Sequence, residues 1–421
     1  MSLTLSPQER DMLTGSQGPA VAMALRIVVG TAEMLGADRL IEVASAHIDG
    51  CLYHGDSGTL FAERLVQDGG RVAVPSSLNV GALDLLHAGR VRLPAHQASM
   101  ARRMMDAYAA LGCRQTWTCA PYQAGHRPSL GQDVAWGESN AVVFCNSVLG
   151  ARTNRYGDYL DICAALTARA PLTGLHIPRN RRATLHIDAT GLNPALLAEE
   201  TFYPVLGAWI GRTVGDSVVA VSGLPSGVSE DWLKALGAAA ASSGSVGLFH
   251  VVGTTPEAPD LETACQGQMP LETIHLTAAM LDEARRTLST GQSVPSDALD
   301  GVAVGSPHFS YKEFEMLLAR LDGRRCRIPF YACTGRHVIR ALEAADLLPA
   351  LQAAGITLVA DTCIVVTPIL PEATGLIMTN SGKFAHYTKP NTGCDVLFGS
   401  LSDCVESAVA GRVCRDATLW C

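Results

Sequence analysis

The chain has 421 residues, 48% of them hydrophobic, a size and composition typical of a globular protein with two or three domains. Its formal net charge is −8 and it contains no run of Lys or Arg, which argues against nucleic acid as its main partner. No apolar segment approaches the roughly 18 residues of a membrane span, and polar residues 8–11 stand where a signal peptide needs an apolar stretch, so we expect a cytoplasmic protein without a membrane partner.

The first half of the chain is predicted to mix short strands with helices. Ser6 and Glu9 have the spacing of a capping box, which predicts a helix at the start. Further helices are predicted over 19–36, 59–68, 96–111 and 156–169, and strands over 40–46, 71–74, 115–118 and 141–144. Polar loops follow these strands, including the predicted loop 75–79.

From about residue 217 the pattern becomes regular. Strand-like runs over 217–221, 246–252, 302–304, 328–332 and 356–360 alternate with helix-like segments, which indicates parallel βαβ units. Ligands of such sheets bind outside the carboxyl ends of the strands, where Ser306, His308, Cys333 and Cys363 fall. A compact segment from Asn380 and a helix over 400–411 are expected to close the fold.

The pattern divides the chain into three expected parts. Residues 1–210 form an α/β part with most of the site motifs, residues 211–380 a βαβ-repeating part, and residues 381–421 a closing segment. No repeat or linker separates them, so the boundaries rest on the change of pattern alone.

The cysteines are the first candidates for chemistry. There are thirteen, none in a C-x-x-C pair, and in a reducing compartment most are buried thiols that act as small hydrophobes. Cys119 and Cys363 differ, because each stands at a predicted strand end beside polar groups. Thiolates placed in this way suit an iron–sulfur or metal site built from distant segments, whereas a zinc site using His47 and His54 is the weaker alternative.

Charged side chains around residues 138–155 are further candidates. The guanidinium groups of Arg152 and Arg155 suit a carboxylate or phosphate, or else form structural salt bridges. Glu138, beside Trp136, is either a general acid or base or the partner of an arginine. Neither G-x-G-x-x-G nor a P-loop motif is present, which argues against an ordinary dinucleotide or nucleotide site.

Several motifs together carry a family resemblance. They are Ser45–Gly50, Cys119–Tyr122, Ala135–Ser139, Asn146–Arg155 and Asp361–Val366. With these motifs the chain, from about residue 8 to 412, resembles the catalytic part of aconitase X. The resemblance implies an α/β fold of aconitase-like three-layer α/β/α subdomains with mainly parallel sheets.

The same resemblance implies a function. The family consists of iron–sulfur dehydratases with two known activities, on cis-3-hydroxy-L-proline and on mevalonate 5-phosphate. A small swivelling domain, fused or separate, completes these enzymes, so the chain resembles a large subunit that needs a small-subunit partner and acts on a small hydroxy acid.

One departure from the family pattern guides the choice of activity and cofactor. Ser306 stands where the archaeal enzymes have a cysteine, and a hydroxyl is a poor iron ligand. We therefore expect the metal ligands to be Cys119, Cys363 and Cys145, holding a 2Fe-2S cluster in preference to a 3Fe-4S or 4Fe-4S cluster. The departure favours the hydroxyproline activity; mevalonate 5-phosphate dehydratase and a non-catalytic, cluster-free binding subunit are the alternatives.

The resemblance also suggests roles for individual side chains. His47 and Glu138 are the expected acid and base, in competition with a base from the small subunit, and Lys389 is expected to neutralise developing charge. The expected substrate-binding residues are Ser76, Ser77, Asn79, Ser139, Asn146, Ser147, Arg152, Asn154, Arg155 and His308.

Overall fold

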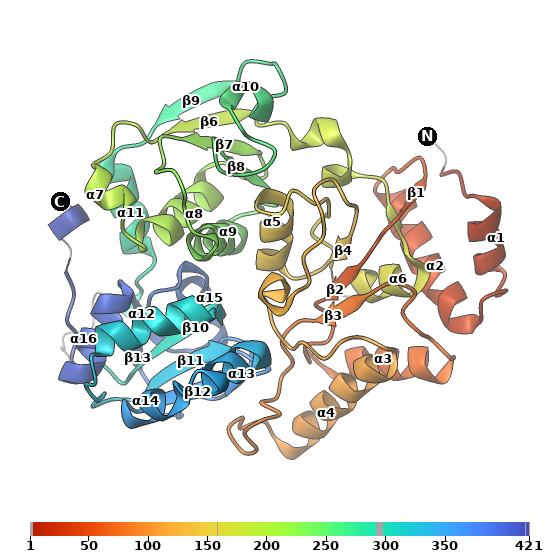
Figure 1. Cartoon of the computed structure of the whole chain (residues 1–421). Coiled ribbons are helices and arrows are strands. Elements are labelled where there is room, and N and C mark those ends of the chain that lie inside the picture. Colours follow the sequence, from red (N-terminus) through yellow and green to blue (C-terminus); the bar gives the residue numbers. More distant parts are fainter. Residues whose placement is uncertain (1–2, 158, 292–297, 417, 421) are drawn as a thin grey trace. The chain divides into compact units, whose positions relative to one another are not determined.

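The chain folds into two compact units. The computed structural model describes residues 3–157, 159–291, 298–416 and 418–420 (Figure 1). Unit 1 comprises Met1–Leu83 and Leu93–Arg182, and unit 2 comprises Asp84–Arg92 and Ala183–Cys421. Residue 210, where a boundary was expected, lies inside helix α8 of unit 2.

Unit 1 contains a small parallel sheet in the order β3-β2-β4 and an antiparallel pair, β1 and β5. Its strands are β1 (Leu40–Glu42), β2 (Ala46–Ile48), β3 (Ser76–Leu78), β4 (Ala135–Trp136) and β5 (Arg169–Pro171). Its helices are α1 (Pro7–Leu13), α2 (Pro19–Met34), α3 (Asp56–Gln67), α4 (Ala95–Ala110), η1 (Pro121–Ala124), α5 (Ser139–Ser147), α6 (Leu160–Thr167), η2 (Gly174–His176) and η3 (Pro178–Arg181). Because β2, β3 and β4 are parallel, their carboxyl ends meet at one edge of the sheet.

The first half of unit 2 contains a four-stranded parallel sheet in the order β8-β7-β6-β9. Its strands are β6 (Leu185–Asp188), β7 (Val219–Ser222), β8 (Phe249–Val251) and β9 (Glu272–His275). Its helices are α7 (Pro194–Leu197), α8 (Phe202–Thr213), α9 (Glu230–Ser243), α10 (Leu261–Ala264) and α11 (Ala278–Thr287). Helices α8 and α9 pack closely because Gly207 and Gly211 have no Cβ to meet the backbone of α9.

The second half of unit 2 contains a five-stranded parallel sheet in the order β12-β11-β10-β13-β14 (Figure 1). Its strands are β10 (Gly301–Phe309), β11 (Phe330–Thr334), β12 (Ile356–Ala360), β13 (Leu376–Thr379) and β14 (Asp395–Phe398). Its helices are α12 (Tyr311–Leu321), α13 (Arg336–Ala344), α14 (Leu348–Ala353), α15 (Gly382–Thr392), α16 (Leu401–Ala410) and η5 (Thr418–Trp420). Helix α15 packs against this sheet and also against α8 and α9.

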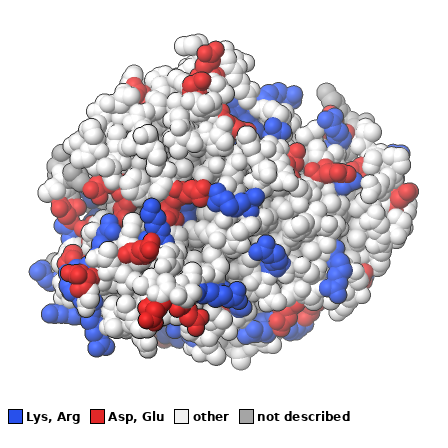
Figure 2. Space-filling model, in the orientation of Figure 1, with Lys and Arg blue, Asp and Glu red and all other residues white. Residues whose placement is uncertain are grey.

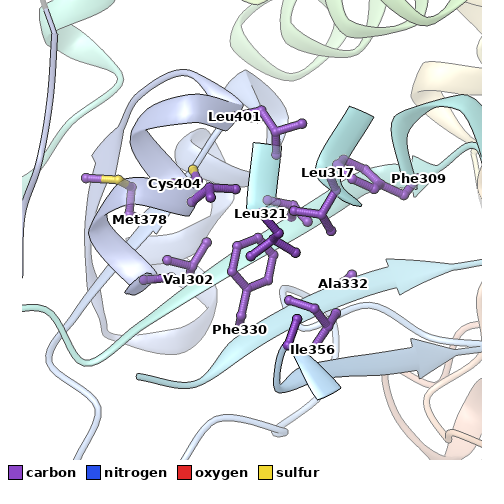
Figure 3. Close-up of a cluster of buried hydrophobic side chains, with 14 of the residues drawn as sticks. Val302, Phe309, Leu317, Leu321, Phe330, Ala332, Ile356, Met378, Leu401 and Cys404 are labelled. Atoms are coloured by element: carbon purple, nitrogen blue, oxygen red, sulfur yellow. The ribbon is translucent and has the colours of Figure 1, made fainter. Parts of the chain in front are cut away.

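The core of this second sheet is a cluster of buried apolar side chains from β10 to β14 and from α12, α13, α14 and α16. Figure 3 shows the ring of Phe330 directed toward Leu321 of α12, with Val302 and Ile356 from neighbouring strands beside it. Each large apolar side chain that is buried in this way stabilises the fold by about 1.5–3 kcal/mol. The cluster fixes the strands whose carboxyl ends carry Ser306, Cys333 and Cys363.

The predicted α/β class with mainly parallel sheets is confirmed, and strands were found in all five predicted runs of the second half. Two strands predicted in the first half were wrong. In the segment 71–74, the backbone N–H groups of Val72 and Ala73 donate to the carbonyls of Leu111 and Ala165, so no ladder with a neighbouring strand forms. Strand β3 forms instead in the segment 75–79, which was predicted to be a loop. Over 115–118 the side-chain hydroxyl of Thr116 accepts a hydrogen bond from the backbone N–H of Leu78 and donates one to the Leu78 carbonyl. In a strand, the backbone of residue 116 would make these hydrogen bonds.

Two further segments are helical where a helix was not predicted. The apolar run 141–144 lies in α5, whose N-terminus is capped by Glu138, and the segment after Asn380 is α15, capped by Ser381. Among the described residues, no helix combines the length and apolar character needed to cross a membrane. Figure 2 shows acidic and basic side chains interspersed over the face that it draws.

Candidate active site

The first candidate site lies at the carboxyl ends of β2 and β3 in unit 1. His47 and Ser77 face each other in the register of these parallel strands, and Nδ1 of the buried His47 is 2.8 Å from the Ser77 hydroxyl. The same hydroxyl is 2.7 Å from Nδ1 of His126, whose Nε2 is 2.9 Å from the hydroxyl of Ser45. We call Ser45, His47, Ser77 and His126 the histidine–serine chain.

The two imidazoles of the histidine–serine chain, those of His47 and His126, are neutral at pH 7. Burial, with the nearby His126, lowers the pKa of His47 to about 3 although the charge of Glu138 opposes the shift, and burial with the charge of Arg114 lowers the pKa of His126 to about 4. A neutral imidazole has one donor and one acceptor nitrogen. Nε2 of His47 has no hydrogen-bond partner among the described residues, so one nitrogen of this ring is available to a substrate.

Glu138, expected to be an acid or base, is the N-cap of α5. Its carboxylate accepts a hydrogen bond from the backbone N–H of Ala141 at 2.6 Å and one from the Ser139 hydroxyl at 3.2 Å. Helix N-termini favour negative charge, so this position stabilises the anion. The charge of Glu138 in turn raises the pKa of His47, which indicates an electrostatic action on that ring.

A second polar group adjoins the carboxyl ends of β2 and β3. The side-chain amide of Asn79 donates a hydrogen bond to the carboxylate of Asp49. The backbone N–H of Asp49 in turn donates to the carboxylate of Asp161 at 2.5 Å. A Cβ on Gly137 would lie 2.6 Å from the Asp161 carboxylate, so only glycine fits there. The amide oxygen of Asn79 has no partner among the described residues, whereas the Ser76 hydroxyl donates to the Val74 carbonyl at 2.9 Å. Asn79 is therefore the better candidate for binding a substrate.

The loop 146–155 is expected to bind substrate, and the amides of Asn146 and Asn154 also hold its backbone. Asn146 exchanges two hydrogen bonds with the backbone of Thr153, at 2.9 and 3.0 Å, and also accepts from Arg181. Asn154 donates to the Thr173 carbonyl at 3.0 Å. The guanidinium Nε of Arg152 is buried without a partner among the described residues. The remaining expected residues are Ser147, buried at the end of α5, and Arg155, which is exposed.

The second candidate site lies at the carboxyl ends of β10, β11 and β12 in unit 2. Side-chain hydrogen bonding with Cys333 and with Ser306 lowers the pKa of the Cys363 thiol. The β10–β11 register shifts between Val304 and Phe309, and a Cβ on Gly305, whose φ is +90°, would lie 2.1 Å from the Cys333 carbonyl oxygen. Glycine at 305 thus allows close approach of the two strand ends. We call Ser306, Cys333 and Cys363 the sulfur group.

The sulfur group favours a thiolate. Hydrogen bonds from Cys333, the Val365 backbone and Ser306, with the charge of Lys383, outweigh burial and lower the pKa of Cys363 to about 7. His308 is fully buried, which lowers its pKa to about 4, and its Nε2 lies 3.1 Å from the Thr362 carbonyl. Because a carbonyl only accepts, Nε2 carries the proton and Nδ1 is an acceptor.

The structure also shows the surroundings of the other three expected residues. Cys119 is buried in unit 1, where its carbonyl accepts from Asn140 at 2.9 Å. Cys145 lies within α5 in an apolar cluster, and burial raises its pKa. Lys389 is half-exposed and pairs with Asp395 at 3.0 Å.

Sequence reasoning overlooked two side chains that the structure brings into these groups. His126 follows a turn of η1 and belongs to no strand, so no pattern signalled it. Cys333 had been located at a strand end, and that position was the available signal. Within the described ranges, no group of three or more His, Cys, Asp or Glu side chains is arranged to hold a metal ion.

Family models match almost the whole chain. The first domain of aconitase X matches residues 2–179, the second domain residues 183–286, and the third domain residues 299–410. A solved structure of aconitase X from Thermococcus kodakaraensis, in its holo-form, is similar with a TM-score of 0.86 and 31% identity, covering 97% of this chain and 100% of that one.

Curated relatives agree with the family models. The chain is 41% identical to the cis-3-hydroxy-L-proline dehydratase of Pseudomonas aeruginosa, over 98% of this chain and 71% of that protein. It is 39% identical to the enzyme of the same name from Hypocrea jecorina, over 98% of this chain and 69% of that protein. It is 34% identical to the phosphomevalonate dehydratase large subunit of Methanothermobacter thermautotrophicus, over 94% of this chain and 96% of that protein. The chain therefore belongs to the aconitase X family.

Proposed function

We propose that the chain is a hydro-lyase that removes water from cis-3-hydroxy-L-proline and forms pyrroline-2-carboxylate. The observation that carries this proposal is the order of similarity. Two enzymes named for that substrate are 41% and 39% identical to the chain, against 34% for the phosphomevalonate dehydratase large subunit. Mevalonate 5-phosphate is the alternative substrate within the same family.

The reaction removes the α-proton and the 3-hydroxyl group, and the resulting enamine tautomerises to the cyclic imine. The α-carbon is a weak acid, so its proton requires a positioned base. Nε2 of His47 fits this role because the ring is neutral and that nitrogen has no partner among the described residues. When Nε2 accepts a proton, Nδ1–H can donate to Ser77, whose hydroxyl can pass its own proton to His126. A base from a small subunit is the competing assignment.

The departing hydroxide requires an acid. We assign an iron–sulfur cluster to this enzyme, with Cys363 as a ligand and two irons as the expected composition. When bound, such a cluster supplies a Lewis acid for the hydroxyl. The sulfur group fits a cluster, since its hydrogen bonds favour the Cys363 thiolate, the form that binds iron.

The substrate carboxylate is assigned to Arg152 and Arg155, with Asn79 as a further polar contact. The buried Nε of Arg152 supports this choice because a guanidinium nitrogen without a protein partner gains most from an anionic ligand. We also assign a small-subunit partner, since the archaeal relative that the chain matches over 96% of its length is named a large subunit. We also propose a cytoplasmic location for the enzyme.

The test is a two-substrate assay on the anaerobically purified chain, alone and with the small-subunit partner. We expect kcat/KM for cis-3-hydroxy-L-proline to exceed that for mevalonate 5-phosphate by more than about 100-fold, the discrimination that differential contacts can supply. The reverse preference would assign the chain to the phosphomevalonate enzymes. Iron-free protein that acts on neither substrate would indicate a non-catalytic subunit.

A further inference from the structure

Unit 2 contains a cavity of about 230 Å³ whose described lining includes no residue of the sulfur group or of the histidine–serine chain. It lies at the carboxyl end of β14, the kind of position at which parallel sheets bind ligands. The first turn of α16, the helix α11 and the segment that follows α16 also line it. The volume is below the roughly 300–1,000 Å³ of pockets for drug-sized ligands, so the cavity fits a small molecule.

Two guanidinium groups line this cavity. Arg285 of α11 pairs with Asp282 at 2.6 Å and lies over the ring of Trp420, 5.4 Å from its centroid. Arg415 donates to the Phe398 carbonyl at 2.8 Å and, within the described ranges, forms no ion pair. Partial burial and the charge of Arg285 lower the pKa of Arg415, so a negative group between the two guanidiniums would relieve their repulsion. A carboxylate suits that position because a guanidinium offers it two parallel donors.

Carboxylates line the same cavity, so its charge is not that of a simple anion site. Asp403 accepts hydrogen bonds from two backbone N–H groups, at 2.8 and 2.9 Å. Asp416 accepts from the backbone and the hydroxyl of Thr418, at 2.9 and 2.7 Å. In the part of the chain that the structure describes, the half-buried carboxylate of Glu199 makes no hydrogen bond or ion pair. A ligand that has an ammonium group for Glu199 as well as a carboxylate for Arg415 would use both charges.

We propose that this cavity binds a free amino or imino acid in its zwitterionic form. The ligand carboxylate would lie against Arg415 and Arg285, and the ammonium group against Glu199. The ring of Trp420, which is 9% exposed, offers an apolar surface for the ligand side chain. The inference does not depend on the proposed function, because it uses none of the residues that are assigned to the reaction.

The test is equilibrium dialysis of the full chain with radiolabelled L-proline. Glycine, acetate, methylammonium and inorganic phosphate serve as competitors, since acetate has only the negative group and methylammonium only the positive group of the zwitterion. Arg415→Gln and Glu199→Gln each remove one charge of the cavity. Arg412→Gln, at an exposed arginine of the same segment, is the matched control, and Arg152→Gln alters only the assigned substrate site.

We expect L-proline affinity to fall about tenfold or more in Arg415→Gln and in Glu199→Gln, and to stay unchanged in Arg412→Gln and Arg152→Gln. Glycine should compete at least about tenfold better than acetate or methylammonium, because each of these makes only half of the charged contacts.

Three results would overturn the inference and leave the proposed function standing. They are no L-proline binding by the wild type, wild-type affinity in both cavity variants, and binding that is lost only in Arg152→Gln. Phosphate that competes as well as glycine, with no effect of Glu199→Gln, would also overturn it in favour of a simple anion site. Far-UV circular dichroism checks the folding of each variant. If Arg415→Gln does not fold, Glu199→Gln decides, because its side chain has no partner among the described residues to lose.

Discussion

The hydroxyl of Ser77 lies 2.8 Å from Nδ1 of His47, and the two residues face each other across adjacent parallel strands. The same hydroxyl contacts His126, so one side chain joins two neutral, buried imidazoles. The arrangement orients His47 and leaves its Nε2 available.

Ser77→Ala should lower kcat by about 100-fold with little change of KM, because removing the link costs the base its orientation and its route for the proton. His126→Gln should have a similar effect. The control is Thr59→Val, which removes another buried hydroxyl of unit 1, one that donates to the Met100 carbonyl. Steady-state kinetics decide: equal kcat in Ser77→Ala and Thr59→Val would exclude a role for the link.

The histidine–serine chain should make stability depend on pH. The folded pKa values of His47 and His126, about 3 and about 4, lie below the value of about 6.5 in the unfolded chain, so below pH 6.5 the unfolded state binds protons that the folded state does not. The free energy of unfolding should therefore fall as pH falls from 6.5 to 4, by up to about 1.4 kcal/mol per pH unit for each imidazole.

Urea unfolding between pH 4 and pH 7 measures this dependence. His126→Gln removes one of the two groups and should make the fall with pH less steep. An unchanged slope in the variant would mean that His126 is protonated in the folded protein.

Gly305→Ala should disrupt the sulfur group. The new Cβ would lie 2.1 Å from the Cys333 carbonyl oxygen, and φ of +90° is unfavourable for any residue with a Cβ. We expect lower stability, by roughly 1–3 kcal/mol or more, together with loss of iron binding. Gly323→Ala is the control, because φ there is +70° and no atom lies within 4 Å of the added Cβ. Iron binding that falls equally in both variants would exclude the proposed close approach.

Lys234→Met should destabilise the protein by about 3–5 kcal/mol, because it leaves two partly buried carboxylates without their cation. Lys234 is 2% exposed and pairs with Asp231 at 2.9 Å and with Glu313. Lys389→Met is the control, since its exposed pair with Asp395 is worth about 0–1 kcal/mol. Thermal unfolding compares the two. The activity of Lys389→Met also tests whether that lysine neutralises charge in the reaction.

The sequence predicted strands β7, β8, β10, β11 and β12 of unit 2 because they are apolar runs spaced by helices, a local signal, whereas β6, β9, β13 and β14 were not predicted. The strands of unit 1 are two or three residues long and depend on distant partners, so β3 and β4 were not predicted. The run 141–144 has the composition of a strand, yet the cap at Glu138 and packing on all sides favour a helix.

The sequence identified several residues of the candidate sites, but it did not predict which of them contact one another. His47, Ser77 and Cys363 were identified as candidates, but their partners His126 and Cys333 depend on strand register and loop geometry that one sequence does not reveal. Substrate binding by Asn146 and Asn154 stays a prediction. Their amides also hold the loop backbone, a role that the sequence alone does not distinguish from ligand binding.

The most direct test of the account is the formation of pyrroline-2-carboxylate from cis-3-hydroxy-L-proline by the anaerobically reconstituted chain with its small-subunit partner, measured together with bound iron before and after chelation. We predict product formation that rises in proportion to iron per chain and disappears when iron is removed. Product formation at the full rate by iron-free protein, or none by fully loaded protein, would contradict the account.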